Sequence, residues 1–375
     1  MDTHDFGQRS GLQVGPVSLG GMRFPPNTRK AVDLVRHAID QGLRYIDTSR
    51  GYGESEYIVG RALRDGYRDR VLLSTKWAPW IKPIDPDDDT SAAAVRRRIE
   101  EQLVRLDVER VDFYQVWSLG SLQQLDQVCA PGGTVDGIRK AREDGLVGHL
   151  GMTSHIPLDD LYTRLDALDW VEALLLSFNL MNRKAAKVLR AAHERGIATL
   201  VMNPVGGGAL AEPSPVLADL AREAGAESVP DLAVRYVVGQ PYIDTLLCGA
   251  HRPEDVDATV ASARRGPLDA AALARVDERL DSLAPEEVGF CTACKYCMPC
   301  PEGINIPAVM QAVYRDRYWG LHKTARQRYR RLKGPKAEAC TRCGTCVTRC
   351  TQHLDIPAEM AYAAEAFAEE ESATP

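Results

Sequence analysis

Residues 43–76, LRYIDTSRGYGESEYIVGRALRDGYRDRVLLSTK, contain the pattern that decides the fold. One apolar run, LRYIDT, ends at Thr48, and a second, VLLSTK, ends at Lys76. Between them, SEYIVGRALRDG places apolar residues every three or four positions, which is the spacing of an amphipathic helix. Continuous apolar runs suit parallel strands that are covered on both faces. The stretch is therefore predicted to form a strand, a helix and a second, parallel strand.

The same alternation continues in both directions, from about residue 14 to about residue 250. Six further strand candidates are VGPVSLG near residue 15, VDFYQVW ending at Trp117, VGHLGM ending at Met152, VEALLL near residue 171, IATLVM ending at Met202 and IDTLLC ending at Cys248. About eight strand-helix units in this length are typical of a closed barrel. The sequence thus predicts an α/β fold, a (β/α)8 TIM barrel over residues 1–285, whose last helix covers about 269–285 and ends at Pro285.

Cysteine is concentrated behind this barrel. Eight of the ten cysteines belong to two motifs, CTACKYCMPCP from residue 291 and CTRCGTCVTRC from residue 340. Cysteines three residues apart are poorly placed for many disulfides, and no feature indicates an oxidising compartment. Metal ligation is therefore predicted, with the ligands Cys291, Cys294, Cys297, Cys300, Cys340, Cys343, Cys346 and Cys350.

The spacing also indicates the kind of metal site. Two residues between thiolates let one loop hold three corners of a cubane, while the fourth thiolate comes from elsewhere in the chain. Two structural zinc sites are the alternative, because paired CxxC motifs can form a tetrathiolate. Four cysteines in each motif, with Pro301 after the first motif, favour two 4Fe-4S clusters. Residues 286–375 are thus predicted to be a mostly helical, ferredoxin-like iron-sulfur domain. Its resemblance to two-cluster ferredoxins implies that Cys350 completes the first set and Cys300 the second.

Composition excludes several other classes of protein. A formal net charge of -6 argues against general nucleic-acid binding. No apolar run approaches the length that crosses a bilayer, so no membrane partner is expected. The first residues lack a basic stretch followed by an apolar core, which predicts a cytoplasmic location. The acidic tail after about residue 366 is expected to be disordered at its end.

Polar residues end the predicted strands, where barrels carry their chemistry. The second strand leads to Asp47 and, one loop later, Tyr52, and the third ends at Lys76. In these residues the chain resembles the aldo-keto reductases, which use an aspartate, a tyrosine, a lysine and a histidine at such positions. The resemblance implies hydride transfer between a nicotinamide and an organic carbonyl or alcohol. Tyr52 would supply the proton, Lys76 would lower the tyrosine pKa, and Asp47 would hold Lys76.

The fourth strand departs from this family. It ends in Trp117, where the family usually has a histidine that helps to orient and polarise the carbonyl. Trp117 is included among the predicted catalytic residues, although it could instead point into the core or merely line the cleft. Reduction of ordinary aldehydes is not implied.

The resemblance also implies a nicotinamide site. Ser154 and His155 match the residues that contact the carboxamide, and the glycines of VMNPVGGGAL permit close approach to a pyrophosphate. Arg252 favours NADP over NAD. The predicted cofactor residues are Gly21, Met22, Ser154, His155, Met202, Asn203, Pro204, Gly206, Gly207, Gly208, Gly249 and Arg252. All of them precede residue 260, so nucleotide binding is expected to need the barrel alone.

Three functions remain open at this point. The clusters could serve a nicotinamide-dependent oxidoreductase as an electron port, or they could be only structural in such an enzyme. Alternatively, the barrel could hold nucleotide without turnover, as an electron-transfer or regulatory module, because Trp117 replaces a catalytic group. The basic stretch with Arg326, Arg328, Arg330, Arg331 and Lys333 could dock an acidic ferredoxin or flavodoxin, or be a solvated helix face.

Overall fold

The computed structural model describes residues 1–81, 86–283, 291, 293–318, 320 and 322–368. The chain forms two compact units. The first consists of Met1–Phe178, Lys184–Pro204 and Val234–Pro267, and the second of Asn179–Arg183, Val205–Ala233 and Leu268–Pro375. The predicted boundary between residues 285 and 286, Pro285 itself, and the end of the acidic tail lie outside the described residues.

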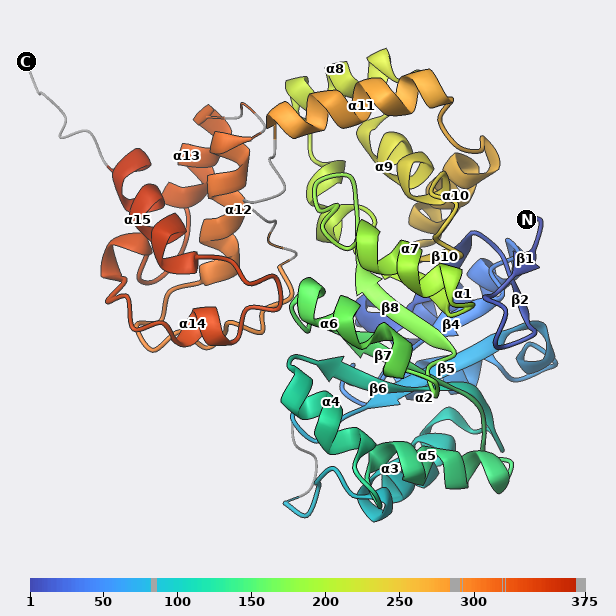
Figure 1. Ribbon diagram of the computed structural model, residues 1–375. Helices are drawn as coiled ribbons and strands as arrows, with labels where there is room; N and C mark the ends of the chain where they lie inside the picture. The colour runs from blue at the N-terminus through green and yellow to red at the C-terminus, as the bar shows by residue number, and fades with distance from the viewer. Residues whose placement is uncertain (82–85, 284–290, 292, 319, 321, 369–375) are drawn as a thin grey trace, which may run out of the picture. The chain divides into compact units, whose positions relative to one another are not determined.

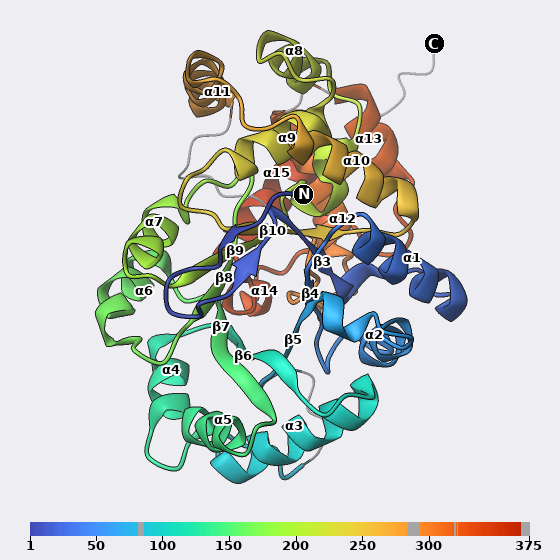
Figure 2. The ribbon, with the colours of Figure 1, turned by 90° about the vertical axis from the view of Figure 1, so that its right-hand side faces the viewer.

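A closed parallel barrel forms the centre of the first unit, with the strand order β10-β3-β4-β5-β6-β7-β8-β9. Figure 2 shows these strands as a ring with α1, α2, α3 and α5 outside it. The strands are β3 Val17–Gly20, β4 Tyr45–Asp47, β5 Leu72–Trp77, β6 Val111–Leu119, β7 Val147–Ser154, β8 Ala173–Ser177, β9 Ala198–Met202 and β10 Thr245–Gly249. Each of the eight apolar runs forms one of these strands, so the predicted barrel is confirmed.

Helices follow the strands because their sequences are amphipathic, and some of them are capped by a side chain. In α1, Thr28–Asp40, the buried residues Ala31, Leu34, Val35, Ala38 and Ile39 recur at helical spacing, and the Asn27 side chain accepts a hydrogen bond from the Lys30 N–H. The other helices that begin in this unit are α2 Ser55–Ala62, α3 Ala92–Leu106, α4 Leu122–Cys129, α5 Thr134–Glu143, α6 Leu158–Arg164, α7 Ala186–Glu194 and α10 Pro253–Arg264.

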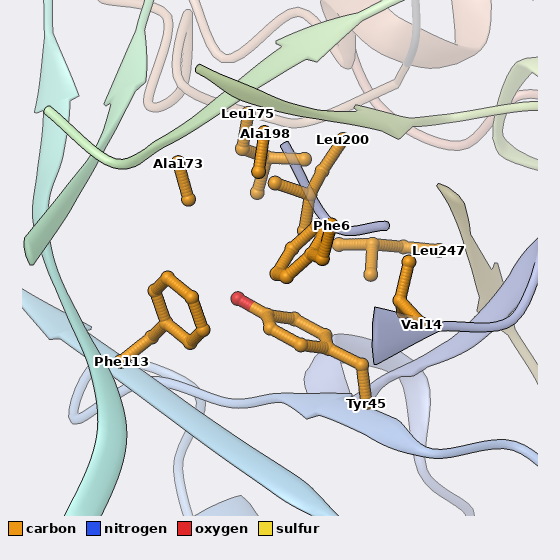
Figure 3. Close-up of a cluster of buried hydrophobic side chains, with 9 residues drawn as sticks. All are labelled: Phe6, Val14, Tyr45, Phe113, Ala173, Leu175, Ala198, Leu200 and Leu247. Carbon is orange, nitrogen blue, oxygen red and sulfur yellow. The ribbon is translucent and has the colours of Figure 1, made fainter. Parts of the chain in front are cut away.

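An N-terminal hairpin, which the sequence did not predict, covers one end of the barrel. Its strands are β1 His4–Asp5 and β2 Gln13–Val14. Between them, the Phe6 ring lies 5.3 Å from those of both Tyr45 and Phe113. Figure 3 shows these three rings together in the core cluster of Phe6, Val14, Tyr45, Phe113, Ala173, Leu175, Ala198, Leu200 and Leu247. Several of these residues begin their strands, so the hairpin covers the N-terminal strand ends. The polar residues that end the strands therefore lie at the opposite end of the barrel.

The second unit is mostly helical, as predicted for the C-terminal part of the chain. Its elements are η4 Gly206–Ala211, α8 Pro215–Glu223, α11 Ala270–Leu283, α12 Ile306–Arg317, α13 His322–Arg330, η6 Ala337–Ala339, α14 Thr345–Thr348 and α15 Ile356–Ala366. Helix α9 Val229–Val238 begins in this unit and ends in the first. Helices α12 and α13 lie between the cysteine motifs, and the basic stretch lies on α13 and just after it. Among the described residues, no helix is long and apolar enough to cross a membrane.

The two cysteine motifs fold as repeats of one another. Ala293 and Arg342, each two residues after the first cysteine of its motif, both have positive φ angles, 53° and 55°. After the last cysteine of each motif a helix starts in the same way, because Asn305 accepts from the backbone of α12 and Asp355 from that of α15. The two cysteine motifs are thus repeats in backbone structure as well as in sequence.

Candidate active site and cysteine clusters

Asp47 and Lys76 form a buried ion pair at the ends of neighbouring strands. The Lys76 Nζ contacts Asp47 Oδ2 and donates to the Thr48 carbonyl at 3.0 Å. The second oxygen of Asp47 accepts from Gln115 Nε2 at 2.9 Å and Ser74 Oγ at 3.4 Å. Burial raises the pKa of Asp47, while the Lys76 ammonium and the hydrogen bonds oppose that rise. The carboxylate thus holds Lys76 and is itself held in place by two further side chains.

Tyr52 follows in the loop between β4 and α2. Its ring centre lies 4.7 Å from the Lys76 Nζ. Burial, and to a lesser extent the negative charge of Asp47, raise the pKa of Tyr52 well above its ordinary value. The net direction is opposite to the lowering that the resemblance implies, because burial and the Asp47 charge outweigh the effect of the Lys76 ammonium on the phenol. The phenol remains protonated and can act as a proton donor.

Trp117 lies against Tyr52, in a T-shaped contact with ring centres 5.4 Å apart. A Cβ on Gly51 would approach the indole to 2.4 Å, so glycine leaves room for this ring. Trp117 is only 4% exposed. The structure therefore brings Trp117 together with Asp47, Tyr52 and Lys76.

An irregularity in β6 sets the position of this tryptophan. The sequence predicts that the strand ends at Trp117, but it continues to Leu119 through a shift of register after Val116. Ser118 has a φ angle of 58°, and the Trp80 Nε1–H is shared between the carbonyls of Trp117 and Ser118 at 3.1 and 3.0 Å. Bulges of this kind commonly redirect a side chain beside an active site.

A buried polar network, not predicted from the sequence, connects the Tyr52 loop to β5. Glu56 is fully buried and accepts from Thr75, Gln102 and Arg105, each at 2.7 Å. Arg105 also donates to the Gly53 carbonyl at 2.8 Å. Thr75 directly precedes Lys76 in β5. The network therefore fixes the loop that carries Tyr52 against the strand that carries Lys76. The final glutamate of the string YGESE is the only sequence signal for it.

Several predicted nicotinamide residues lie at the same strand ends. Ser154 ends β7, and the His155 N–H donates to the Leu119 carbonyl at 2.6 Å. Gly21 directly follows β3, and its carbonyl accepts from Ser55 Oγ at 2.9 Å. Met22 comes next and is 50% exposed.

The remaining candidates of the first unit follow β9 and β10. Met202 ends β9 and packs against the hydrophobic core, and the next residue, Asn203, has a φ angle of 62°. Pro204, which is buried, is the last residue of that segment. Gly249 ends β10. Arg252 caps α10 and pairs with Asp255 at 3.1 Å, so this arginine already has a partner in the protein.

The three predicted pyrophosphate glycines belong to the second unit. Gly206, Gly207 and Gly208 open η4 with φ angles of 59°, 69° and 95°. Three consecutive residues in this region of backbone space require glycine.

The clustered cysteines lie close to one another in the second unit. Cys297, Cys300, Cys340, Cys343 and Cys346 line one pocket. Burial raises the pKa of Cys291 to about 12, and the nearby thiols of Cys294, Cys297 and Cys350 contribute to the rise. Cys350 thus lies near thiols of the first motif and Cys300 near Cys346 of the second, while Cys297 is near Cys346 as well. The division of the ligands between two clusters stays a prediction.

Four thiols around a pocket fit a cubane, in which each cysteine binds a different iron atom. Across the described part of the chain, no three histidine, cysteine or carboxylate side chains form a group that could hold one metal ion.

Comparisons with known proteins agree with this architecture. The model of the aldo/keto reductase family matches residues 12–281, and that of the 4Fe-4S dicluster domain matches residues 290–355. The chain is 25% identical over 289 residues to the uncharacterized oxidoreductase YqkF of Bacillus subtilis, covering 68% of this chain and 90% of that protein. It is 27% identical over 286 residues to the aldo-keto reductase YhdN of the same organism, covering 67% and 84%.

A solved structure shows the same fold. The aldo-keto reductase AKR11C1 from Bacillus halodurans matches with a TM-score of 0.65 at 21% identity, covering 76% of this chain and 99% of that one. Because the family model spans most of the chain and the barrel carries the motif residues at its strand ends, the protein belongs to the aldo/keto reductase family and carries a C-terminal 4Fe-4S dicluster domain.

Proposed function

We propose that this protein transfers hydride between a nicotinamide cofactor, NADP or NAD, and an organic carbonyl or alcohol. The observation that supports this most strongly is the position of Lys76, which contacts the Asp47 carboxylate and lies 4.7 Å from the Tyr52 ring. A half-buried acid beside a fixed cation is the arrangement that carbonyl reduction needs, because the oxygen that gains negative charge must receive a proton in a site with little water.

Each of the three residues has a role in this chemistry. When bound, the reduced nicotinamide would supply the hydride that forms the new C–H bond. Tyr52 gives its proton to the carbonyl oxygen as the C=O double bond opens, and water later restores that proton. Lys76 stabilises the phenolate that Tyr52 leaves, and Asp47 keeps Lys76 in place. Because the pKa of Tyr52 is raised, the resting phenol is protonated and can give its proton to the carbonyl oxygen.

Trp117 has a different role from the histidine of the family. An indole offers one N–H donor and no titratable proton, so Trp117 cannot serve as an acid. Its ring covers one side of Tyr52 and restricts the space beside the phenol. We therefore assign substrate selection to Trp117 and leave proton transfer to Tyr52.

We further propose that the two sets of cysteines hold two 4Fe-4S clusters, which would supply one-electron transfer. The mutual grouping of the thiols supports this assignment. Clusters that are only structural would leave hydride transfer intact but would not exchange electrons with a nicotinamide. Anaerobic addition of NADPH or NADH, with the visible absorbance of the clusters as the readout, separates the two cases: bleaching supports an electron port, and its absence with retained turnover supports a structural role.

An acidic one-electron carrier such as a ferredoxin or flavodoxin is the partner that we propose. Arg326, Arg330, Arg331 and Lys333 are exposed on α13 and just after it. Arg328, which belongs to the same basic stretch of sequence, instead pairs with Glu212 at 3.3 Å. The docking surface thus rests on four cations and is expected to be sensitive to salt.

Isotope transfer tests the proposed reaction directly. NADPH or NADH carrying deuterium at C4 is incubated with the cluster-loaded protein and a panel of aldehydes and ketones, and the alcohols formed are analysed by mass spectrometry. Deuterium on the former carbonyl carbon is the expected result. Nucleotide binding without deuterium transfer to any member of the panel would instead support a barrel that binds nucleotide without turnover.

A further inference from the structure

A half-buried ion pair joins the glycine loop after β9 to the iron-sulfur segment. Arg315 of α12 is 3% exposed, and its Nε donates to Glu212 Oε2 at 2.6 Å while its Nη2 contacts Glu212 Oε1. Arg315 also donates to the Gln311 carbonyl at 2.5 Å. From α13, Arg328 Nη1 reaches Glu212 Oε1 at 3.3 Å. One carboxylate therefore holds two arginines that lie between the two cysteine motifs.

Glu212 directly follows η4, whose first three residues are the glycines with positive φ. Such a run has great conformational freedom, so ordering it around a ligand costs entropy. Gly320 lies close by, since a Cβ built on it would come within 3.4 Å of Val216 Cγ2. The segment from Gly206 to Val216 is thus held by the Glu212 ion pair and lies beside a residue of the iron-sulfur segment. All of these contacts lie within the second unit.

The charges of this arrangement suit an anion in the loop. Loops after the seventh strand of such barrels commonly bind phosphate through backbone N–H groups. An unpaired Glu212, four residues after Gly208, would repel a pyrophosphate, and pairing with Arg315 and Arg328 neutralises that charge. The ion pair therefore both orders the loop and removes an unfavourable charge from it.

We propose that Glu212 is a positioning residue for nucleotide binding, so that the iron-sulfur segment, through Arg315 and Arg328, sets how tightly the glycine loop binds the pyrophosphate of the nicotinamide dinucleotide. This inference rests on the proposed function, since it assigns the glycine loop to the nucleotide pyrophosphate. It replaces the expectation that nucleotide binding needs the barrel alone. The arginines that support the loop lie more than fifty residues beyond the last predicted nucleotide contact.

Nucleotide titration of the full-length, cluster-loaded protein tests the inference. The variants are Glu212→Gln, which removes the charge, and Arg328→Gln, which removes only the more exposed partner. Arg222→Gln is the matched control, because Arg222 forms an exposed pair with Asp219 on α8 of the same unit. NADPH and NADH affinities are measured by fluorescence, amide hydrogen exchange is followed over residues 205–212, and iron content reports whether the clusters are intact.

We expect Glu212→Gln to weaken nucleotide binding by about tenfold or more. Without the ion pair the free loop is less ordered, so part of the binding free energy is used to order it. Exchange over residues 205–212 should be faster without nucleotide, while iron content stays unchanged. Arg328→Gln should show a smaller effect in the same direction, and Arg222→Gln should match wild type. Should Glu212→Gln fail to fold, Arg328→Gln still decides the question.

Two outcomes count against the inference in different ways. If the wild type binds nucleotide and both loop variants bind equally well with unchanged hydrogen exchange, the inference is overturned and the proposed function stands. If the wild type binds neither NADPH nor NADH, the proposed function fails, and this inference fails with it.

Discussion

The Lys76 ammonium lies over the ring of Tyr52, 4.7 Å from its centre, while the same ammonium is paired with a buried carboxylate. The cation that could stabilise a phenolate is thus already compensated in the resting protein. A tyrosine in these surroundings is a protonated acid that becomes an anion only when its proton moves to a substrate.

The pH dependence of carbonyl reduction follows from this arrangement. Because the pKa of Tyr52 is raised well above its ordinary value, the phenol stays protonated through alkaline pH. We expect kcat for reduction to be flat up to about pH 9, since the ordinary tyrosine pKa is already about 10. A loss of kcat with a midpoint near pH 8, in protein whose circular dichroism is unchanged, would show that the acid is a group with a lower pKa.

Removal of the Asp47 charge should destabilise the barrel. Asp47→Asn leaves Lys76 as an uncompensated buried cation, and breaking a buried pair in this way costs about 3–5 kcal/mol. Urea unfolding followed by tryptophan fluorescence measures the loss. Asp107→Asn is the control, because the Arg64–Asp107 pair is largely exposed and is worth at most about 1 kcal/mol. Equal stability of the two variants would mean that the Asp47 pair contributes no more than a surface pair.

Gly51→Ala should disturb the site through Trp117. The added methyl group would lie 2.4 Å from the indole, so the ring must move. Overpacking of this kind costs about 1–3 kcal/mol, and the displaced ring should lower turnover because it packs against Tyr52. Gly15→Ala adds the same methyl group where the nearest atom is 3.9 Å away, and it should behave like wild type. Wild-type turnover and stability in Gly51→Ala would show that the position of Trp117 is not tightly constrained.

Iron content tests the grouping of the cysteines. Anaerobically prepared protein should contain about eight irons per chain, four for each cubane. The double variant Cys294→Ser with Cys350→Ser removes two ligands of one set and should retain about four irons. Cys294→Ser with Cys300→Ser affects both sets and should lose iron from both. If the first double variant loses all iron, or the second retains a full cluster, the two sets are wrongly divided.

The barrel could be predicted from the sequence because its strands are continuous apolar runs and its helices are strongly amphipathic. The N-terminal hairpin could not, since strands as short as His4–Asp5 and Gln13–Val14 carry too few residues to show alternation. The insertion of Phe6 into the barrel is a tertiary contact with no local sequence signal. It nevertheless determines which end of the barrel is covered.

The site was predicted in its residues more fully than in its electrostatics. Spacing identified Asp47, Tyr52 and Lys76, but the direction of the Tyr52 pKa depends on burial and on the contact between the other two. Gln115 was missed because a polar residue within a buried strand reveals its role only once the facing strands are placed. The support that Arg315 gives to Glu212 joins residues about a hundred positions apart, and no local pattern reports it.

Single-turnover kinetics of Tyr52→Phe test the central claim most directly. The variant keeps the ring beside Lys76 and removes only the proton, so nucleotide affinity should stay within a few-fold of wild type. The rate of carbonyl reduction should fall by about 10²–10⁴, the usual contribution of general acid catalysis. A wild-type reduction rate in Tyr52→Phe would show that the proton comes from another group and would contradict the assignment of Tyr52 as the acid.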